Sequence, residues 1–291
     1  MPMILGGFPP TGLVLLSIVS VQVGAGLAIN LFPILGAEGT VAVRIVISAL
    51  LLALTVRKRT RALSQMFIQN WKLLLVFGFC IAIMNLFFYQ ALARIPLGAT
   101  VALEFIGPLS VAAFTSRKLS HFAWIALAAL GIFLLSPLSG VDLDSLGIIF
   151  ALLAGVGWGL FIIFAKRVGD RIPGNDGIVI AMVIAALTML PFAAPVATVL
   201  ISNPLILLTA LAVALLSTTI PFTFEFHALR RMPSRNYSIL VSVEPAVAAI
   251  IGALLLGERI GLQGVIAVAC VVIAAIGISL TGSADKPDTA V

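Results

Sequence analysis

Charged residues are scarce in this sequence, and their scarcity decides the class of protein. Only 10% of the 291 residues are Asp, Glu, Lys or Arg, whereas 62% are hydrophobic. An ordinary soluble domain is about a quarter charged and about half apolar. With a mean hydropathy of +1.23, the chain lacks the polar side chains that a water-covered surface needs. The composition therefore predicts a protein whose surface faces lipid.

Reactive and nucleotide-binding groups are also few. The cysteines, Cys80 and Cys270, lie inside apolar runs, which is typical of small buried hydrophobes and not of a disulfide or a metal site. The histidines, His121 and His227, have no metal-ligand spacing to a carboxylate, and no Gly-Lys dipeptide supplies a Walker A loop. We find no hydrolase or acyltransferase motif. We therefore expect no cofactor, no metal, no ATP and no enzymatic activity.

Basic residues are distributed asymmetrically between the apolar runs. The net charge is +6, but the basic residues form short clusters and no long stripe, which excludes a nucleic-acid role. The clusters at 57–72, 117–118, 166–171 and 230–235 fall in alternate loops, and the other loops hold Arg94 and Arg259. Because Lys and Arg mark cytoplasmic loops, we expect both termini in the cytoplasm.

The apolar runs predict ten spanning helices, since a bilayer needs about twenty mostly apolar residues for each span. Turn signals rich in Pro, Gly, Asn and Ser separate the runs. No cleavage-site pattern follows the first run, so we expect it to be retained as a helix. The predicted ranges are 12–35, 38–56, 72–93, 97–116, 120–138, 145–167, 177–195, 204–229, 235–256 and 262–281.

An internal repeat is the second organising feature. Residues 91–96 (A-L-A-R-I-P) are similar to residues 228–233 (A-L-R-R-M-P), and the same register aligns Gly107-Pro108 with Glu244-Pro245. Chance recurrence of small residues and proline in membrane helices is the alternative explanation. A duplicated half with five spans must be inverted, because an odd number of spans reverses its orientation. Inverted repeats are a recurring architecture of alternating-access carriers.

The expected fold is thus an all-α membrane protein, with ten transmembrane helices arranged as two inverted five-helix repeats around a central cavity. Residues 1–140 would form the first repeat and residues 141–291 the second. A substrate would bind at the interface between the repeats, near the membrane midplane.

Several motifs resemble the drug/metabolite transporter superfamily. They include the A-L-x-x-x-P turn at residues 91–96, the stretch from Pro96 to Leu109, Glu244-Pro245 and Leu256-Gly257-Glu258. The resemblance covers essentially the whole chain and is strongest to the ten-helix bacterial amino-acid exporters.

This resemblance implies a multi-pass secondary transporter of the bacterial inner membrane. Its expected substrates are small amino acids such as threonine and homoserine, with methionine and aromatic amino acids as wider candidates. Its expected mechanism is alternating access, with proton coupling left open. The alternatives are an exporter of other small metabolites or drugs, and a passive channel. The expected partners are the substrate, protons and membrane lipid.

Ionisable residues within predicted spans are costly, and are therefore candidates for function. Arg44 and Glu104 are predicted at the same depth, about 10 Å below the outer edge of the core. They could form a structural ion pair, or bind a zwitterion with Arg44 at its carboxylate and Glu104 at its ammonium. Glu244 is predicted near the midplane beside helix-breaking Pro245, as a proton or amine site or as a cap for the freed backbone. Glu104 and Glu244 are the proton-coupling candidates, whereas Glu225 is expected to reach the interface.

Uncharged polar residues complete the predicted cavity. Gln22 and Asn30, with Gly26 between them, recur every four residues and so share one face of the first helix. Asn85 and Tyr89 share a face of the third helix in the same way.

Two further cavity candidates have a structural alternative. Trp158 could stack on a substrate or only pack, beside Gly155 and Gly159, whose spacing is typical of close helix packing. Ser217 could line a flexible section of its helix or bond back to its own backbone.

Overall fold

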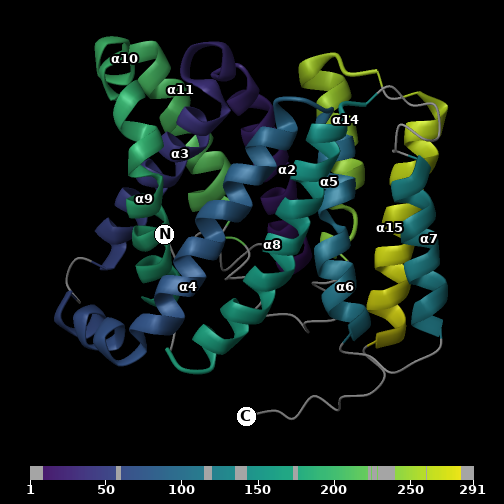
Figure 1. The fold of residues 1–291 in the computed structure, drawn as a ribbon, viewed down its shortest axis with the longest axis horizontal. Helices are drawn as coiled ribbons and strands as arrows, with labels where there is room; N and C mark the ends of the chain where they lie inside the picture. Colours follow the sequence, from purple (N-terminus) through teal and green to yellow (C-terminus); the bar gives the residue numbers. More distant parts are fainter. Residues whose placement is uncertain are drawn as a thin grey trace.

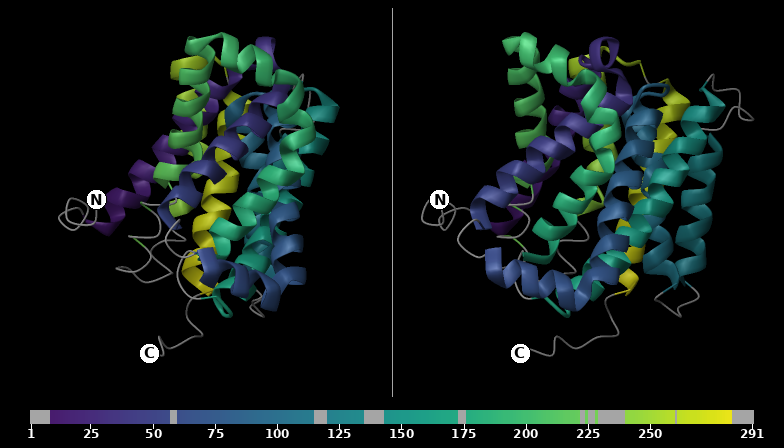
Figure 2. Two further views of the ribbon diagram at one scale, coloured as in Figure 1. Left: turned by 90° about the vertical axis from the view of Figure 1, so that its left-hand side faces the viewer. Right: turned by 60° about the vertical axis from the view of Figure 1, so that its left-hand side comes forward.

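All regular structure in the described part of the chain is helical. The computed structural model describes residues 9–56, 60–114, 120–134, 143–172, 176–221, 224, 228, 240–259 and 261–282, and these contain no strand. The helices run side by side as a bundle, with α7 and α15 together at one edge (Figure 1, Figure 2). Glu225 and residues 229–239, which carry part of the repeat match, lie outside the described residues.

Apolar helices of two lengths form the bundle. Five are long and apolar enough to cross a membrane, and the others have shorter apolar stretches, such as Leu262–Gly277 within α15. The long ones are α2 (Pro10–Ile29), α3 (Phe32–Val56), α4 (Thr60–Leu92), α8 (Ser145–Gly169) and α9 (Asp176–Ala193), which continues through η3 (Ala194–Val196) into α10 (Ala197–Ser202). The shorter ones are α5 (Leu97–Glu104), α6 (Ile106–Phe114), α7 (Ser120–Leu134), α11 (Pro204–Ala214) with the π-helical η4 (Leu215–Thr219), α14 (Glu244–Leu256) and α15 (Leu262–Gly282).

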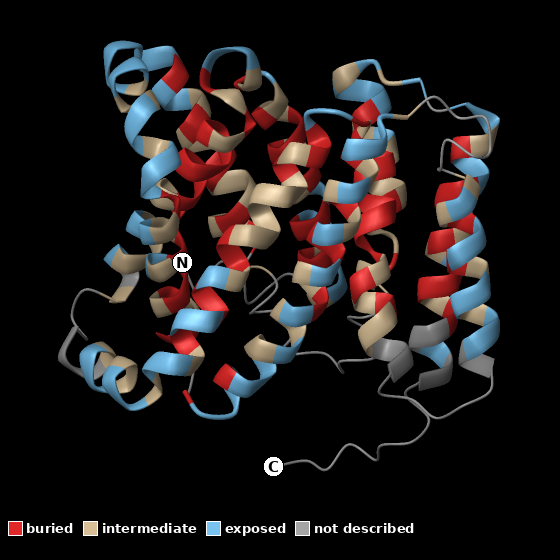
Figure 3. Ribbon diagram, in the orientation of Figure 1, coloured by how far each residue is buried: buried red, intermediate tan, exposed pale blue. Residues whose placement is uncertain are grey.

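Every predicted range overlaps one of these helices, which confirms the all-helical membrane class. The ten-span count and the inverted repeat stay predictions. Large apolar side chains are exposed, such as Leu254 at 75% and Leu187 at 60%. Exposed residues recur along the outer helices of the bundle (Figure 3). Such faces suit lipid and would be costly in water.

Proline and glycine break several predicted helices. The predicted range 97–116 is wrong as one helix, because α5 ends at Glu104 and α6 begins at Ile106. Pro108 has no amide hydrogen to donate to the carbonyl of Glu104, so the helix cannot continue unbroken. The first predicted range also runs too far, since α2 ends at Ile29.

The second half of the chain contains matching irregularities. The predicted range 204–229 changes to a π-helix at Leu215–Thr219, two to six residues before Pro221, which cannot bond to the carbonyl of Ser217. Residues 242–243 form a turn before α14, where Pro245 deprives the carbonyl of Val241 of its helical partner. The loosened helix predicted beside Pro245 is therefore confirmed.

Glycines allow the broken helix to lie against α8. A Cβ atom added to Gly107 would lie 1.8 Å from the carbonyl oxygen of Gly155, and one added to Gly155 would lie 2.7 Å from that of Glu104. Gly159 also packs against Gly107. The close packing predicted for Gly155 and Gly159 is thus confirmed, and it fixes the position of the break beside α8.

Most helix contacts join the first half of the chain to the second. The closest partners include α4 with α8, α3 with α9, α5 with α14, α7 with α15, and α2 with η4. The two halves therefore form one intertwined bundle and no separate lobes.

We predict that Gly107→Ala will destabilise the bundle by about 1–3 kcal/mol, because the added methyl group would overlap the backbone of α8. Gly169→Ala is the matched control, since nothing lies within 4 Å of a Cβ there. Thermal unfolding of the detergent-solubilised protein measures both. Equal melting temperatures for the two variants would contradict this account of the α6–α8 contact.

Candidate functional site

A cavity of about 670 Å³ lies among the helices of both halves. Toward the end where α8 finishes and α9 starts, Ala165 and Met182 line it. Toward the opposite end it stops at a buried apolar cluster, which we call the apolar plug. The plug consists of Ala25, Leu92, Leu97, Val101 and Ala248.

The structure brings eight of the nine predicted site residues to this cavity. They come from helices α2, α3, α4, α5, α8 and α14 and from η4. They are Gln22, Arg44, Asn85, Tyr89, Glu104, Trp158, Ser217 and Glu244.

Arg44 is the buried cation of the cavity, with 7% of its surface exposed. Its Nη2 donates to Oδ1 of Asn85, and its Nη1 donates to Oγ1 of Thr218 at 3.3 Å. Asn85 is oriented by its own Nδ2, which donates to the carbonyl of Ile81 at 2.8 Å. The guanidinium also lies 5.0 Å from the ring centroid of Tyr89. Neutral partners from α4 and η4 thus hold the cation in place.

The proposed ion pair between Arg44 and Glu104 is not formed. In the described part of the chain, Arg44 makes hydrogen bonds to Asn85 and Thr218 and no ion pair with Glu104. Both residues line the same cavity, and their equal depth in the membrane stays a prediction. The rotation of α3, which turns the guanidinium toward α4 and η4, could not be read from depth alone.

Two carboxylates occupy the same cavity. Glu104 is 7% exposed at the end of α5, and it interacts electrostatically with both Glu244 and Arg44. Glu244 lies in the first turn of α14, where its Oε1 accepts a 2.9 Å hydrogen bond from Nε2 of Gln22. An acid in the first turn of a helix is favoured by the unsatisfied backbone amides there. Among the described residues, the cavity lining therefore includes one guanidinium and two carboxyl groups.

Several buried polar atoms of cavity residues have no hydrogen-bond partner among the described residues: Oε1 of Gln22, Nε of Arg44, the hydroxyl of Tyr89 and the hydroxyl of Ser217. Tyr89 and Ser217 are near enough to interact, but neither hydroxyl has a well-aligned bond. Buried polar groups without partners are rare in native structures and mark places where a ligand or water binds. These atoms thus belong to four residues that line one cavity.

Aromatic residues line the other part of the cavity. Trp158 packs edge-on to Phe105, with ring centroids 5.4 Å apart and planes at 89°. Phe88 and Phe161 line the cavity as well. Trp158 therefore packs and faces the cavity at once, and the two interpretations of this residue are compatible.

Asn30 was wrongly placed in the cavity. It forms the C-cap of α2, is exposed, and lies on a second, separate pocket of about 460 Å³. Gly26, one turn earlier, packs on Ile251 and Leu255. The four-residue spacing predicted a shared face correctly, but α2 ends before that face reaches Asn30.

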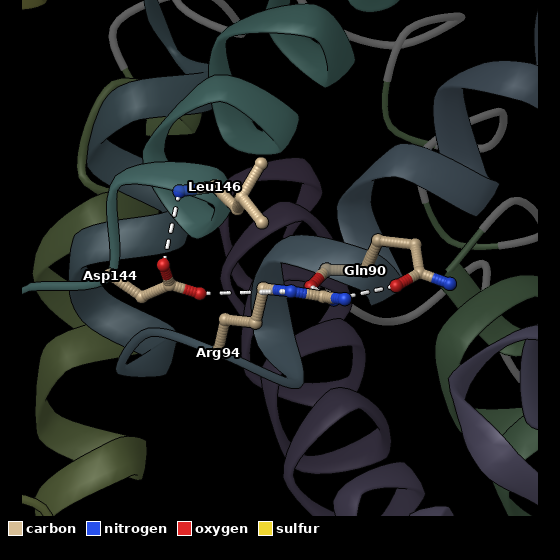
Figure 4. Close-up of polar contacts among 4 residues, drawn as sticks. All are labelled: Gln90, Arg94, Asp144 and Leu146. Carbon is tan, nitrogen blue, oxygen red and sulfur yellow. Dashed lines mark hydrogen bonds and ion pairs between the residues drawn. The ribbon is translucent and has the colours of Figure 1, made fainter.

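Arg94 also lies at this second pocket and ties α4 to α8 (Figure 4). Its Nη1 donates to Oε1 of Gln90 at 2.6 Å, and its Nε lies 3.7 Å from Oδ2 of Asp144. Asp144 caps α8 by accepting from the amide of Leu146 at 3.1 Å. Gln90 in turn donates to Glu38 at 2.6 Å. The sequence analysis named Arg94 only as a loop charge, and it did not single out Gln90 or Glu38, which lie near the ends of predicted spans.

The cavity can bind a small molecule that carries both signs of charge. Arg44 offers donors to an anion, and Glu104 and Glu244 offer acceptors to a cation. The apolar and aromatic lining can cover the uncharged remainder. Among the described residues, no group of His, Cys, Asp and Glu is arranged to hold a metal ion.

Comparisons with known proteins agree with a transport role. Residues 145–280 match the EamA-like transporter family. The threonine/homoserine exporter RhtA of Escherichia coli (strain K12) is 37% identical over 285 residues, covering 94% of this chain and 92% of that protein. The chain belongs to the EamA-like transporter family.

Other members of the EamA-like family are similar over much of their length. The threonine/homoserine exporter RhtA of Salmonella typhimurium (strain LT2) shows the same 37% identity and 94% coverage. The uncharacterized transporter YwfM of Bacillus subtilis (strain 168) is 26% identical over 224 residues, which is 73% of each chain. A solved crystal structure with 14% identity has a TM-score of 0.62 over 94% of this chain and 98% of that one, and so shares the fold. The drug/metabolite transporter resemblance and the multi-pass membrane class are confirmed.

We predict that Asn85→Ala will destabilise the protein by about 1.5–3 kcal/mol, because the buried Arg44 guanidinium would lose a charged hydrogen bond. Asn30→Ala is the matched control at an exposed asparagine and should change little. Thermal unfolding in one detergent compares the two. The account of Arg44 fails if Asn85→Ala unfolds at the same temperature as Asn30→Ala.

Proposed function

We propose that this protein exports threonine, homoserine and related amino acids across the bacterial inner membrane. The observation that carries the proposal is the meeting of one guanidinium and two carboxylates in a single cavity. The names of the Escherichia coli and Salmonella relatives support the same substrates.

An amino acid is a zwitterion whose charges match this cavity. Arg44 keeps its Nε without a partner, so the guanidinium has a donor to spare for the substrate carboxylate. Glu104 or Glu244 receives the ammonium. The unpartnered hydroxyls of Tyr89 and Ser217 suit a hydroxylated side chain such as that of threonine or homoserine.

Larger amino acids also fit the proposal. A volume of about 670 Å³ lies within the range of sites that enclose drug-sized ligands. Trp158 and Phe161 give methionine or an aromatic side chain an apolar surface. Other small metabolites or drugs of similar shape are the alternative substrates.

Transport proceeds by alternating access between two inverted repeats. In the predicted repeats, each helix of one half corresponds to the helix five spans away in the other half. Under this exchange, the contact of α4 with α8 becomes the contact of η4 with α2. The same exchange turns the contact of α4 with α9 into that of α11 with α3. The contacts α3–α9, α5–α14 and α7–α15 exchange with themselves. This symmetry supports repeats at residues 1–140 and 141–291, because two related halves packed about one axis make such pairs.

Protons are the proposed coupling ion. Glu104 and Glu244 line the same cavity, so a carboxyl group that carries a proton across the membrane is available beside the substrate site. Both termini lie in the cytoplasm in this proposal, and the further partners are lipid and the substrate. A passive channel would use the same cavity without saturation.

We predict saturable counterflow in proteoliposomes preloaded with threonine, because a carrier must exchange its substrate across one site. Parallel samples preloaded with methionine, phenylalanine or nothing define the range. Flux that rises linearly with concentration would favour the channel. No flux with any amino acid, from protein shown to be folded, would overturn the amino-acid proposal.

Arg44→Ala is expected to reduce counterflow at least a hundredfold, through the loss of a charged contact to the substrate carboxylate, estimated at about 3 kcal/mol. Arg171→Ala, at an exposed arginine beyond the end of α8, is the control and should retain activity. Glu104→Gln or Glu244→Gln should remove any response to an imposed pH gradient. Retention of that response in both variants would exclude these glutamates as the coupling groups.

A further inference from the structure

Helices α5 and α14 form an antiparallel pair that joins the two halves of the chain. At one end of the pair, the cavity residues Glu104 and Glu244 stand where α5 finishes and α14 begins. At the other end, Leu97 begins α5, and Glu258 follows shortly after the last residue of α14. The pair thus connects the cavity carboxylates with the far side of the apolar plug.

Glu258, in the second half of the chain, caps the start of α5 in the first half. The amide of Leu97 donates to both carboxylate oxygens of Glu258, at 2.9 Å to Oε1 and 3.0 Å to Oε2. The residue at the N-cap position of α5 is Pro96, which makes no side-chain cap. A helix start needs acceptors for its first amides and favours negative charge. α5 therefore takes its cap from a residue 161 positions away.

The backbone at the end of α14 places the Glu258 carboxylate against α5. Gly257 adopts a left-handed φ of 65°, and the amide of Glu258 then bonds to the carbonyl of Gly252 at 3.1 Å. A Cβ atom added to Gly252 would lie 2.2 Å from Oε2 of Glu258. Burial raises the pKa of Glu258, while the backbone amides of Leu97 and Gly98 lower it. The glycines thus make room for a partly desolvated carboxylate.

The contact between Glu258 and Leu97 lies at the closed end of the cavity. The apolar plug takes Leu97 and Val101 from α5 and Ala248 from α14. Beyond it lies the second pocket, whose lining includes Leu92 of the plug and Glu258 itself. A path from the cavity to this pocket that runs between α5 and α14 would separate the two helices, and that separation breaks the bond between Glu258 and Leu97.

We propose that Glu258 acts as a lock between α5 and α14. Its bond to the Leu97 amide keeps the cavity closed at the plug end, and this bond breaks when the cavity opens there. The lock rests on the proposed function only in that the cavity opens to each side in turn. Glu258 is a positioning residue, because it lies outside the cavity and acts through α5.

A single cysteine in the cavity tests the lock without any substrate. Val21→Cys places a thiol on the cavity wall, in a background where Cys80→Ser and Cys270→Ser remove the native thiols. A membrane-impermeant maleimide is applied to each face of oriented vesicles in turn. Glu258→Ala should raise labelling from the plug side by about five- to tenfold, as expected for loss of one helix cap, and lower it from the opposite side.

Two further variants distinguish the loss of the contact between Glu258 and Leu97 from a general loss of structure. Glu258→Gln keeps an oxygen that accepts from Leu97 and should behave nearly like the parent. Gly252→Ala keeps the carboxylate but displaces it, and should shift labelling in the same direction as Glu258→Ala. Gly261→Ala, where nothing lies within 4 Å of a Cβ, and Arg259→Ala, at the exposed neighbouring charge, are the controls.

The decisive result is an increase in labelling from the plug side together with a decrease from the opposite side. Unchanged labelling in Glu258→Ala and Gly252→Ala would overturn the lock, and so would a rise from both sides together, which indicates loosening of the whole bundle. Because no amino acid is present, an absence of amino-acid counterflow would not alter either result. The two proposals can therefore fail independently.

Discussion

A membrane tolerates broken helices only where protein or a cavity covers the freed backbone groups. Pro108, Pro221 and Pro245 create such breaks. Pro108 lines the cavity itself, and the irregular segments next to the other two prolines bring Ser217 and Glu244 to it. The breaks turn side chains from the end of α5, from η4 and from the start of α14 toward one space. The position of the cavity follows from this constraint, and so does the clustering of polar residues in a chain that has few of them.

The buried charge of Arg44 organises the polar part of that space. Removing an uncompensated guanidinium from water costs several kcal/mol, so the protein surrounds it with Asn85, Thr218 and the ring of Tyr89. These partners are neutral or weakly polar. The cation is thus held in place while its charge remains available, and the two nearby glutamates supply the opposite sign. A site that left Arg44 paired with Glu104 would offer much less to a zwitterion.

The composition and spacing of the sequence predicted the membrane class and most of the cavity. Arg44, Glu104 and Glu244 were found because charge within an apolar run is rare. Asn30 was misplaced because residue spacing gives the face of a helix but not the residue at which it ends. Glu258 was noticed only as part of a family motif. Its contact with Leu97 depends on how two halves pack, and no local pattern encodes that.

Helices α5 and α14 connect the charged site with the closed end of the cavity. Carboxylates at one end of the pair meet the cavity, and a carboxylate at the other end caps α5. Movement of either helix therefore changes both the charged site and the closed end of the cavity. Such coupling gives a carrier a physical reason to open on one side only after its site has been filled or emptied.

A structure of the protein determined with threonine bound would test the central claim most directly. The account predicts the threonine carboxylate at Arg44 and its ammonium beside Glu104 or Glu244, within the cavity of about 670 Å³. Threonine found instead in the second pocket, against Asn30 and Arg94, with the cavity empty, would contradict it.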